Sequence, residues 1–246
     1  MRQRTLIAVV GGLVFVGVAV GTLPASLLVS RLPPDLKADG VSGSIWSGSA
    51  DAIRLRGTPL GAINWAADLG ALLHGQLAYE IDLSRPDGFV RGHIAASLGN
   101  GLTGENISLE LPVTTLNPER ASTAWQGDLK GTVRLVRVVN SWPTTLAGAF
   151  TLSNLKPPGA DQALGTFAIE FDPKASTPVQ LVGRVSDVDS PLLVRAQLII
   201  RRDRSYVLDG DVTPRPGAPP EVARAVAFLG APDSSGRRQF QITGTF

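Results

Sequence analysis

Two histidines, His74 and His93, are the side chains of this chain best suited to general acid–base catalysis, because the imidazole pKa lies near neutral pH. A serine hydrolase would need one of them to activate a serine. Ser44 and Ser47 lie beside glycines, but neither stands in a Gly-x-Ser-x-Gly sequence with a histidine well downstream. His74 falls at an expected helix end and His93 at an expected strand start. We therefore expect capping or surface roles for both histidines and no catalytic residues.

The chain contains no cysteine, which excludes disulfides, thiolate chemistry and cysteine-ligated metals. A zinc site needs a cluster of three or four ligands, whereas the histidines and carboxylates are scattered over expected strands and turns. Glycine-rich phosphate-binding patterns are absent as well. We expect a protein that is not an enzyme and takes no metal, no cofactor and no small-molecule substrate. The alternative of an enzyme acting on cell-wall polymers would need a cleft with paired carboxylates at roughly 5–10 Å.

Positive and negative charges are almost balanced, with 23 Lys and Arg against 21 Asp and Glu. Without Arg2 and Arg4 the two sums are equal, so the rest of the chain is formally neutral. The one dense basic cluster, Arg201-Arg202-Asp203-Arg204, lies where we expect a hairpin turn. Binding to nucleic acid would require a clustered excess of positive charge, so we expect no nucleic-acid partner.

An uncharged, largely apolar run extends from Thr5 to Ser30. A transmembrane helix over residues 6–29 would be long enough to cross a bilayer, because a hydrocarbon core of about 30 Å needs about 20 helical residues. Residues 1–5, which carry two arginines, then form a cytoplasmic tip, and residues 32–246 form a periplasmic domain. We therefore expect a single-pass protein of the inner membrane. The alternative is a cleaved signal peptide, for which Ala19-Val20-Gly21 is a poor cleavage site.

Apolar and polar residues alternate with a period of two in many segments after residue 32, and turn signals rich in Gly, Pro, Asn and Asp separate these segments. The apolar positions of the clearest segments are Leu77, Tyr79, Ile81 and Leu83; Ile107, Leu109 and Leu111; Phe167, Ile169 and Phe171; Val194, Ala196, Leu198 and Ile200. This pattern predicts an all-β fold with a largely antiparallel, curved or sandwich-like sheet of about a dozen strands. The exposed edges of such a sheet must be covered, charged or paired with a partner.

Two short helices are predicted between the strands, over residues 65–74 and 219–229. The second begins with two prolines and a glutamate, which suit the first turn of a helix. Residues 113–127 contain few strand formers and are the best candidate for a seam between two half-sheets. The last strand is expected over residues 238–246. We expect the second helix to cover its inward side chains, and the residues in contact to be Val222, Val226 and Leu229 on the helix with Phe240, Ile242 and Phe246 on the strand.

Three segments, in this order and spacing, resemble the type II secretion system protein N family. They are Val41-Ser42-Gly43-Ser44-Ile45-Trp46-Ser47-Gly48-Ser49-Ala50, then Gly61-Ala62-Ile63-Asn64-Trp65 with the following Leu72-Leu73-His74-Gly75, and a C-terminal block from Tyr206 to Phe246. The resemblance covers essentially the whole chain. It implies an accessory inner-membrane component of the type II secretion system of Gram-negative bacteria, which supports export of folded periplasmic proteins across the outer membrane. The implied partners are other type II secretion system subunits. Trp46 and Trp65 are expected to be core aromatics beneath glycine turns.

The segment from Trp65 to Leu83 also looks like the N-terminal part of AsmA-type envelope proteins, which implies a lipid-contacting or envelope-maintenance module with an apolar β-groove. Two structural features separate this alternative from a secretion component. A large apolar concavity inside a curved sheet would favour lipid as the partner. A closed sandwich with one exposed edge strand would favour a protein partner that adds a strand.

Overall fold

The computed structural model describes residues 21–30, 34–55, 57–72, 75–97, 101–116, 125–159 and 162–245. The chain forms two compact units, residues 1–86 and residues 87–246, which are described separately here. Residues 6–20 of the predicted transmembrane helix lie outside the described residues. None of the helices in the described ranges has the length and apolar character needed to span a bilayer.

The described end of the predicted transmembrane segment is not continuous helix. Pro24 bridges to Ser44, the backbone N–H of Ala25 donates to the carbonyl of Gly43 at 3.1 Å, and helix α2 begins only at Ser26 (Ser26–Val29). Proline lacks a backbone N–H and biases the preceding residue towards extended conformations, which explains the break. Residues 23–25 are therefore held against the β-domain.

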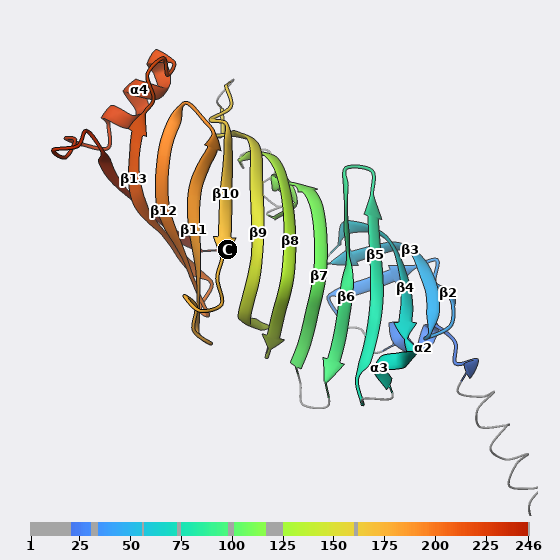
Figure 1. Ribbon diagram of the computed structural model, residues 1–246. Helices are drawn as coiled ribbons and strands as arrows, with labels where there is room; N and C mark the ends of the chain where they lie inside the picture. Colours follow the sequence, from blue (N-terminus) through green and yellow to red (C-terminus); the bar gives the residue numbers. More distant parts are fainter. Residues whose placement is uncertain are drawn as a thin grey trace, which may run out of the picture. The chain divides into compact units, whose positions relative to one another are not determined.

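The strands of unit 1 form an antiparallel sheet in the order β1-β3-β4-β5, with β2 paired to β3 (Figure 1). Their bounds are β1 Leu36–Asp39, β2 Ser42–Gly43, β3 Ser47–Leu55, β4 Thr58–Asp68 and β5 Leu77–Arg85. The predicted helix over residues 65–74 is wrong in its first four residues, because Trp65–Asp68 continue β4 and pair with β5. Leu69–Leu72 are helical, as α3, and residues 73 and 74 lie outside the described residues. Asp68 caps this turn by accepting the backbone N–H of Gly70 at 2.9 Å.

Trp65 packs across the β2–β3 turn. It lies opposite Gly48, and a Cβ added to Gly48 would stand 2.6 Å from the indole ring, so only glycine leaves room for it. The indole N–H donates to the carbonyl of Ser44 at 3.1 Å, and the Ser44 hydroxyl accepts the backbone N–H of Trp46 at 3.2 Å. Trp65 therefore lies against a glycine turn as predicted, but Trp46 and Trp65 are only partly buried and belong to neither core cluster, so the prediction that they are core aromatics is wrong. The role of Ser44 is structural.

Unit 2 is an antiparallel meander in which every described strand pairs with its neighbours in sequence, in the order β6 to β14 (Figure 1). The strands are β6 Gly88–Ser97, β7 Gly101–Pro112, β8 Gln126–Val139, β9 Trp142–Lys156, β10 Thr166–Phe171, β11 Gln180–Asp189, β12 Leu192–Arg201, β13 Ser205–Pro214 and β14 Arg238–Thr245; a 3-10 helix, η1, spans Val113–Leu116. The predicted all-β, antiparallel fold is confirmed. The sheet is a single layer and not a sandwich within the described ranges.

The seam predicted near residues 113–127 is wrong in position. Strands β7 and β8, which flank that segment, pair along eleven residues from Gly101↔Val139 to Pro112↔Asp128. The boundary between the two units lies instead at Pro86 and Asp87, within a turn that the sequence signals by Arg85-Pro86-Asp87-Gly88. Turn residues and domain boundaries share the same composition, so the sequence could not tell one from the other.

One face of the unit 2 sheet is apolar and contains the core. Phe150 and Phe171 meet edge to face with ring centroids 5.9 Å apart, beside the buried Leu181. A second cluster gathers at the other end of the strands, where Val194 and Val212 pack with Val185, Phe167 and Leu192. The period-two alternation of apolar and polar residues explains why the apolar side chains share one face, since successive side chains of a strand point to opposite faces.

Helix α4 (Pro220–Ala227) lies beyond the end of β13 (Figure 1) and packs its apolar side against the second cluster, as predicted. Val222 and Val226 are buried in the second cluster, and Phe240 of β14 is partly buried against it. Two predicted contacts are wrong: Leu229 is 46 % exposed and Ile242 is 47 % exposed. Leu229 lies beyond the end of α4, and Ile242 stands on the last strand of the sheet, so neither has a neighbour on both sides. Phe246 lies outside the described residues.

Candidate functional site

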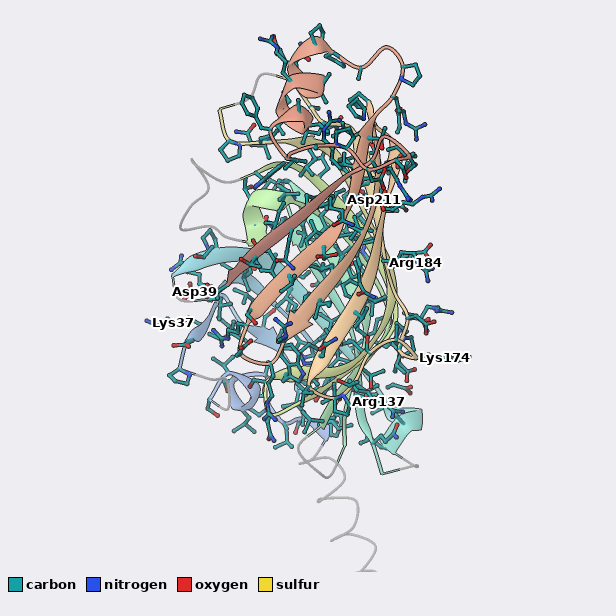
Figure 2. The ribbon with its side chains drawn as sticks, turned by 90° about the vertical axis from the view of Figure 1, so that its left-hand side faces the viewer. Lys37, Asp39, Arg137, Lys174, Arg184 and Asp211 are labelled. Carbon is teal, nitrogen blue, oxygen red and sulfur yellow. The ribbon has the colours of Figure 1, made fainter. Side chains whose placement is uncertain are left out.

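The face of the unit 2 sheet opposite the core carries charged and amide side chains in register. Glu170 lies opposite Arg184, Arg184 opposite Gln197, Gln197 opposite Asp209, and Asp209 opposite Gln241. We call these five residues the polar row; it crosses β10 to β14. Glu170 and Arg184 are directly opposed, and opposite charges in that position stabilise a pair of strands. Figure 2 shows Arg184 and Asp211 on the same side of the sheet.

The strands around the polar row enclose an open hollow of about 840 Å³. Its charged lining consists of Arg134, Arg184, Arg195, Glu170, Asp172 and Asp209. Three of these side chains are positive and three are negative, so the hollow has no excess of either sign. Such a surface suits a partner that is itself of mixed charge, for example a folded protein, better than a polyanion.

The side chain of Asp187, which lies opposite Phe167, is nearly buried, at 5 % exposure. One oxygen accepts the backbone N–H of Val194 at 2.8 Å, and the other pairs with the guanidinium of Arg215. Burial raises the pKa of Asp187, but the hydrogen bonds from Val194 and Arg215 outweigh burial and hold the pKa below its usual value. The pair ties the end of β13 to β11 and β12. The role of this ion pair is therefore structural.

Two aspartates organise the turns of the C-terminal half. Asp203 accepts the hydroxyl and the backbone N–H of Ser205, in the turn between β12 and β13. The prediction that the basic cluster Arg201-Arg202-Asp203-Arg204 lies at a hairpin turn is therefore confirmed. Asp233 likewise accepts the Ser235 hydroxyl at 2.7 Å and the Arg237 backbone N–H at 3.0 Å, and these bonds lower the pKa of Asp233 to about 2. Both aspartates are explained by turn geometry.

The residues considered for catalysis are not brought together. His93 is an exposed residue of β6 that lies opposite Glu105, whereas Ser44 lies in the β2–β3 turn and Ser47 begins β3. His74 lies outside the described residues. In the described part of the chain, no three His, Asp or Glu side chains are close enough to hold a metal ion.

Residues 34–241 match the family described as "Type II secretion system (T2SS), protein N". The chain belongs to this family. Among its relatives, the type II secretion system protein N of Aeromonas hydrophila is 27 % identical over 99 % of both chains. The type II secretion system protein N of Vibrio cholerae serotype O1 is 29 % identical over 90 % of both chains. No solved structure matches the chain.

The matched range includes unit 2 up to Gln241, and thus all five residues of the polar row. Sequence reasoning missed this row because it depends on register: each residue is an ordinary outward-facing position of its own strand, and only the pairing aligns them. The predicted resemblance to the type II secretion system protein N family is confirmed. The resemblance to AsmA-type proteins is not supported by these matches.

Of the two structural features set out for distinguishing a lipid partner from a protein partner, the closed sandwich is not found in unit 2, whose described strands form a single layer. The hollow on the polar row has six charged side chains in its lining, next to apolar ones such as Val182 and Val185. On the apolar face, the side chains of Trp142, Phe171 and Leu181 pack on one another and are buried. An apolar groove for lipid is therefore not favoured. The last strand, β14, pairs on one side only among the described strands.

Proposed function

We propose that this protein is an inner-membrane component of a type II secretion system that supports export of folded periplasmic proteins through contacts with other subunits of the apparatus. The observation that carries the proposal is the family match over residues 34–241, together with two relatives that are similar over at least 90 % of their length and bear this name. The function is one of binding and assembly, without catalysis.

The polar row and its hollow are the surface proposed for these contacts. The balanced charges of the hollow would give directional pairing with a complementary protein surface. Truncation of Arg184 and Arg195 together should weaken such contacts, because both guanidinium groups stand on the exposed face. Neither forms part of the core clusters, so the fold should persist.

A secretion assay tests this function. Deletion of the gene should leave a type II substrate in the periplasm, and the wild-type protein should restore its release into the medium. The Arg184→Ala plus Arg195→Ala protein should restore release to a clearly smaller extent at equal protein level. Arg201→Ala plus Arg204→Ala, two arginines at the β12–β13 turn, is the matched control and should restore release fully. Normal release without the gene would contradict the proposed function.

The proposal places the N-terminus in the cytoplasm and residues 32–246 in the periplasm, with the anchor in the part of the predicted segment before Leu23, because residues 23–25 are held against the β-domain. The support is the length of the uncharged run and the arginines before it. Val14→Arg plus Val18→Arg should reduce membrane insertion, because each charge near the bilayer centre costs about 2.5–3.5 kcal/mol on insertion scales. Membrane fractionation measures the effect, and Val14→Leu plus Val18→Leu is the control. A shorter, released wild-type species would show cleavage and contradict the anchor.

A further inference from the structure

The two end strands of the described sheets differ in how well their free edges are protected. Strand β1 is four residues long, carries Lys37 and Asp39, and Asp39 pairs with Arg54 at 3.3 Å. Strand β14 is eight residues long, pairs with β13 without a bulge, and has neither charge nor proline from Gln239 to Thr245. Natural edge strands usually avoid pairing by being short, charged or bulged. From Gln239 to Thr245 the edge of β14 has none of these protections.

At β14, the apolar side chains on one face of the sheet are incompletely buried, and the polar row on the other face ends. Phe240 is only partly buried against the core, and Ile242 is 47 % exposed beside it on the same face. On the other face, Gln241 ends the polar row and donates its amide to Asp209 at 3.2 Å. A further strand on this edge would continue the apolar layer on one face and the polar row on the other.

We propose that β14 is a self-association site at which a second copy of this chain adds its own β14, antiparallel, about a two-fold axis at Gln241. This arrangement places Phe240 opposite Ile242 of the second copy, and Ile242 opposite its Phe240. Gln239 then faces Thr243, and the two Gln241 side chains face each other. Aromatic pairs with β-branched residues are among the favourable cross-strand pairs. A two-fold interface of this kind is self-complementary.

Neighbouring registers fit less well. An axis at Ile242 would place Phe240 opposite Gly244, whose surface is already covered by the ring of Tyr206. An axis at Phe240 would place Ile242 opposite the charged Arg238. Only the axis at Gln241 pairs apolar with apolar residues on one face and amides or hydroxyls on the other. It also opposes no like charges along residues 239–243, and for this reason a second copy is the occupant we infer.

Cysteine crosslinking in membranes that contain the full chain tests the register, because the protein has no cysteine of its own. Gln241→Cys should form a disulfide-linked dimer on mild oxidation, since directly opposed residues have Cα atoms about 5 Å apart. Gln239→Cys or Thr243→Cys alone should not, because each would lie about 13 Å from its counterpart. Co-expression of a Gln239→Cys chain with a differently tagged Thr243→Cys chain should give the mixed dimer. Asp209→Cys, one strand inward, is the control for random collision.

A charge at the axis provides an independent test. Gln241→Lys in both chains would oppose two ammonium groups, while within each chain the lysine would lie beside Asp209 and leave the fold intact. The mixed Gln239→Cys and Thr243→Cys dimer should then fall at least fivefold, whereas Gln241→Thr should leave it unchanged. The proposal is overturned if Gln241→Cys crosslinks no more than Asp209→Cys, if all single cysteines crosslink alike, or if Gln241→Cys captures a different protein and not a second copy.

Discussion

At the scale of single residues, Asp187 shows how a carboxylate can serve in place of backbone pairing. It accepts the Val194 N–H at 2.8 Å, close to where the β11–β12 ladder ends at Ser186↔Arg195, and it binds Arg215 with its other oxygen. A buried backbone N–H without an acceptor is costly, so one side chain both completes the ladder and fixes the end of β13. Asp187 therefore belongs to the framework that carries the polar row and not to the row itself.

Replacement of Asp187 by alanine should lower the free energy of unfolding by about 2 kcal/mol at pH 7, because a buried hydrogen bond to a charged group is lost and the Val194 N–H is left without an acceptor. Arg215→Ala should cost about 1 kcal/mol or less, since the guanidinium is about half exposed. The pKa of Asp187 is lower in the folded state than in the unfolded state. The contribution of Asp187 to stability is therefore fully present above the unfolded-state pKa near 4, and it is lost as the pH falls through the lower, folded-state pKa.

Denaturant unfolding of wild type and Asp187→Ala at pH 7 and at pH 3 measures this difference. The gap between the two proteins should be largest at neutral pH and should narrow at pH 3. Asp189→Ala, an exposed carboxylate two residues away, is the matched control and should change stability by about half a kcal/mol or less at both values. A gap between wild type and Asp187→Ala that stays constant with pH would mean that the charge of Asp187 contributes nothing.

The role of a residue could be predicted from the sequence where its residue type strongly prefers one local geometry. Trp65 over Gly48 and the aspartate in the 201–204 turn were of this kind. The exposure of Ile242 was not, because alternation tells which face a side chain points to and not whether a neighbouring strand covers it. The polar row needed knowledge of the register as well.

At the scale of elements, α4 illustrates how a helix can be read from its terminal residues and its apolar stripe. Pro220 and Glu221 occupy its first turn, and Val222 and Val226 face the core. The helix predicted over 65–74 failed because its first residues lie between two strands: Trp65 pairs with Gly48 on β3 and with Ile81 on β5. Pairing on both sides outweighed local helix preference. Asp68 marks in the sequence where helix α3 begins, since aspartate favours the N-cap position.

Val226→Ala should lower the free energy of unfolding by about 2 kcal/mol, because two buried methyl groups are removed from a tightly packed cluster. Leu229→Ala removes a larger side chain that is 46 % exposed, and it should cost clearly less. Thermal or denaturant unfolding of the two variants distinguishes them. Equal effects would show that the helix is not docked through Val226 as the structure has it.

At the scale of the whole molecule, the two units differ in the size of their buried side chains. In the described part of unit 1 the buried apolar residues are Ala25, Ala50 and Ile53. Unit 2 buries large side chains, among them Trp142, Phe167, Phe171 and Leu181. Because the hydrophobic contribution grows with the apolar area removed from water, unit 2 should hold most of the stability of the β-domain. The fold class was predictable from alternation throughout, but the position of the boundary was not, since alternation continues on both sides of it.

Amide hydrogen exchange should reveal this difference in local stability. Backbone amides of β11, in the centre of the unit 2 sheet, should exchange much more slowly than those of β4, which is equally central in unit 1, because local opening costs less where few large apolar side chains are buried. Comparison of two interior strands, each with a described partner on both sides, removes the trivial effect of a free edge. Mass spectrometry of peptides covering residues 58–68 and 180–189 in one sample measures both rates under identical conditions. Equal protection of the two strands would show that the units open together as one cooperative structure, and the stability difference argued from their cores would then be wrong.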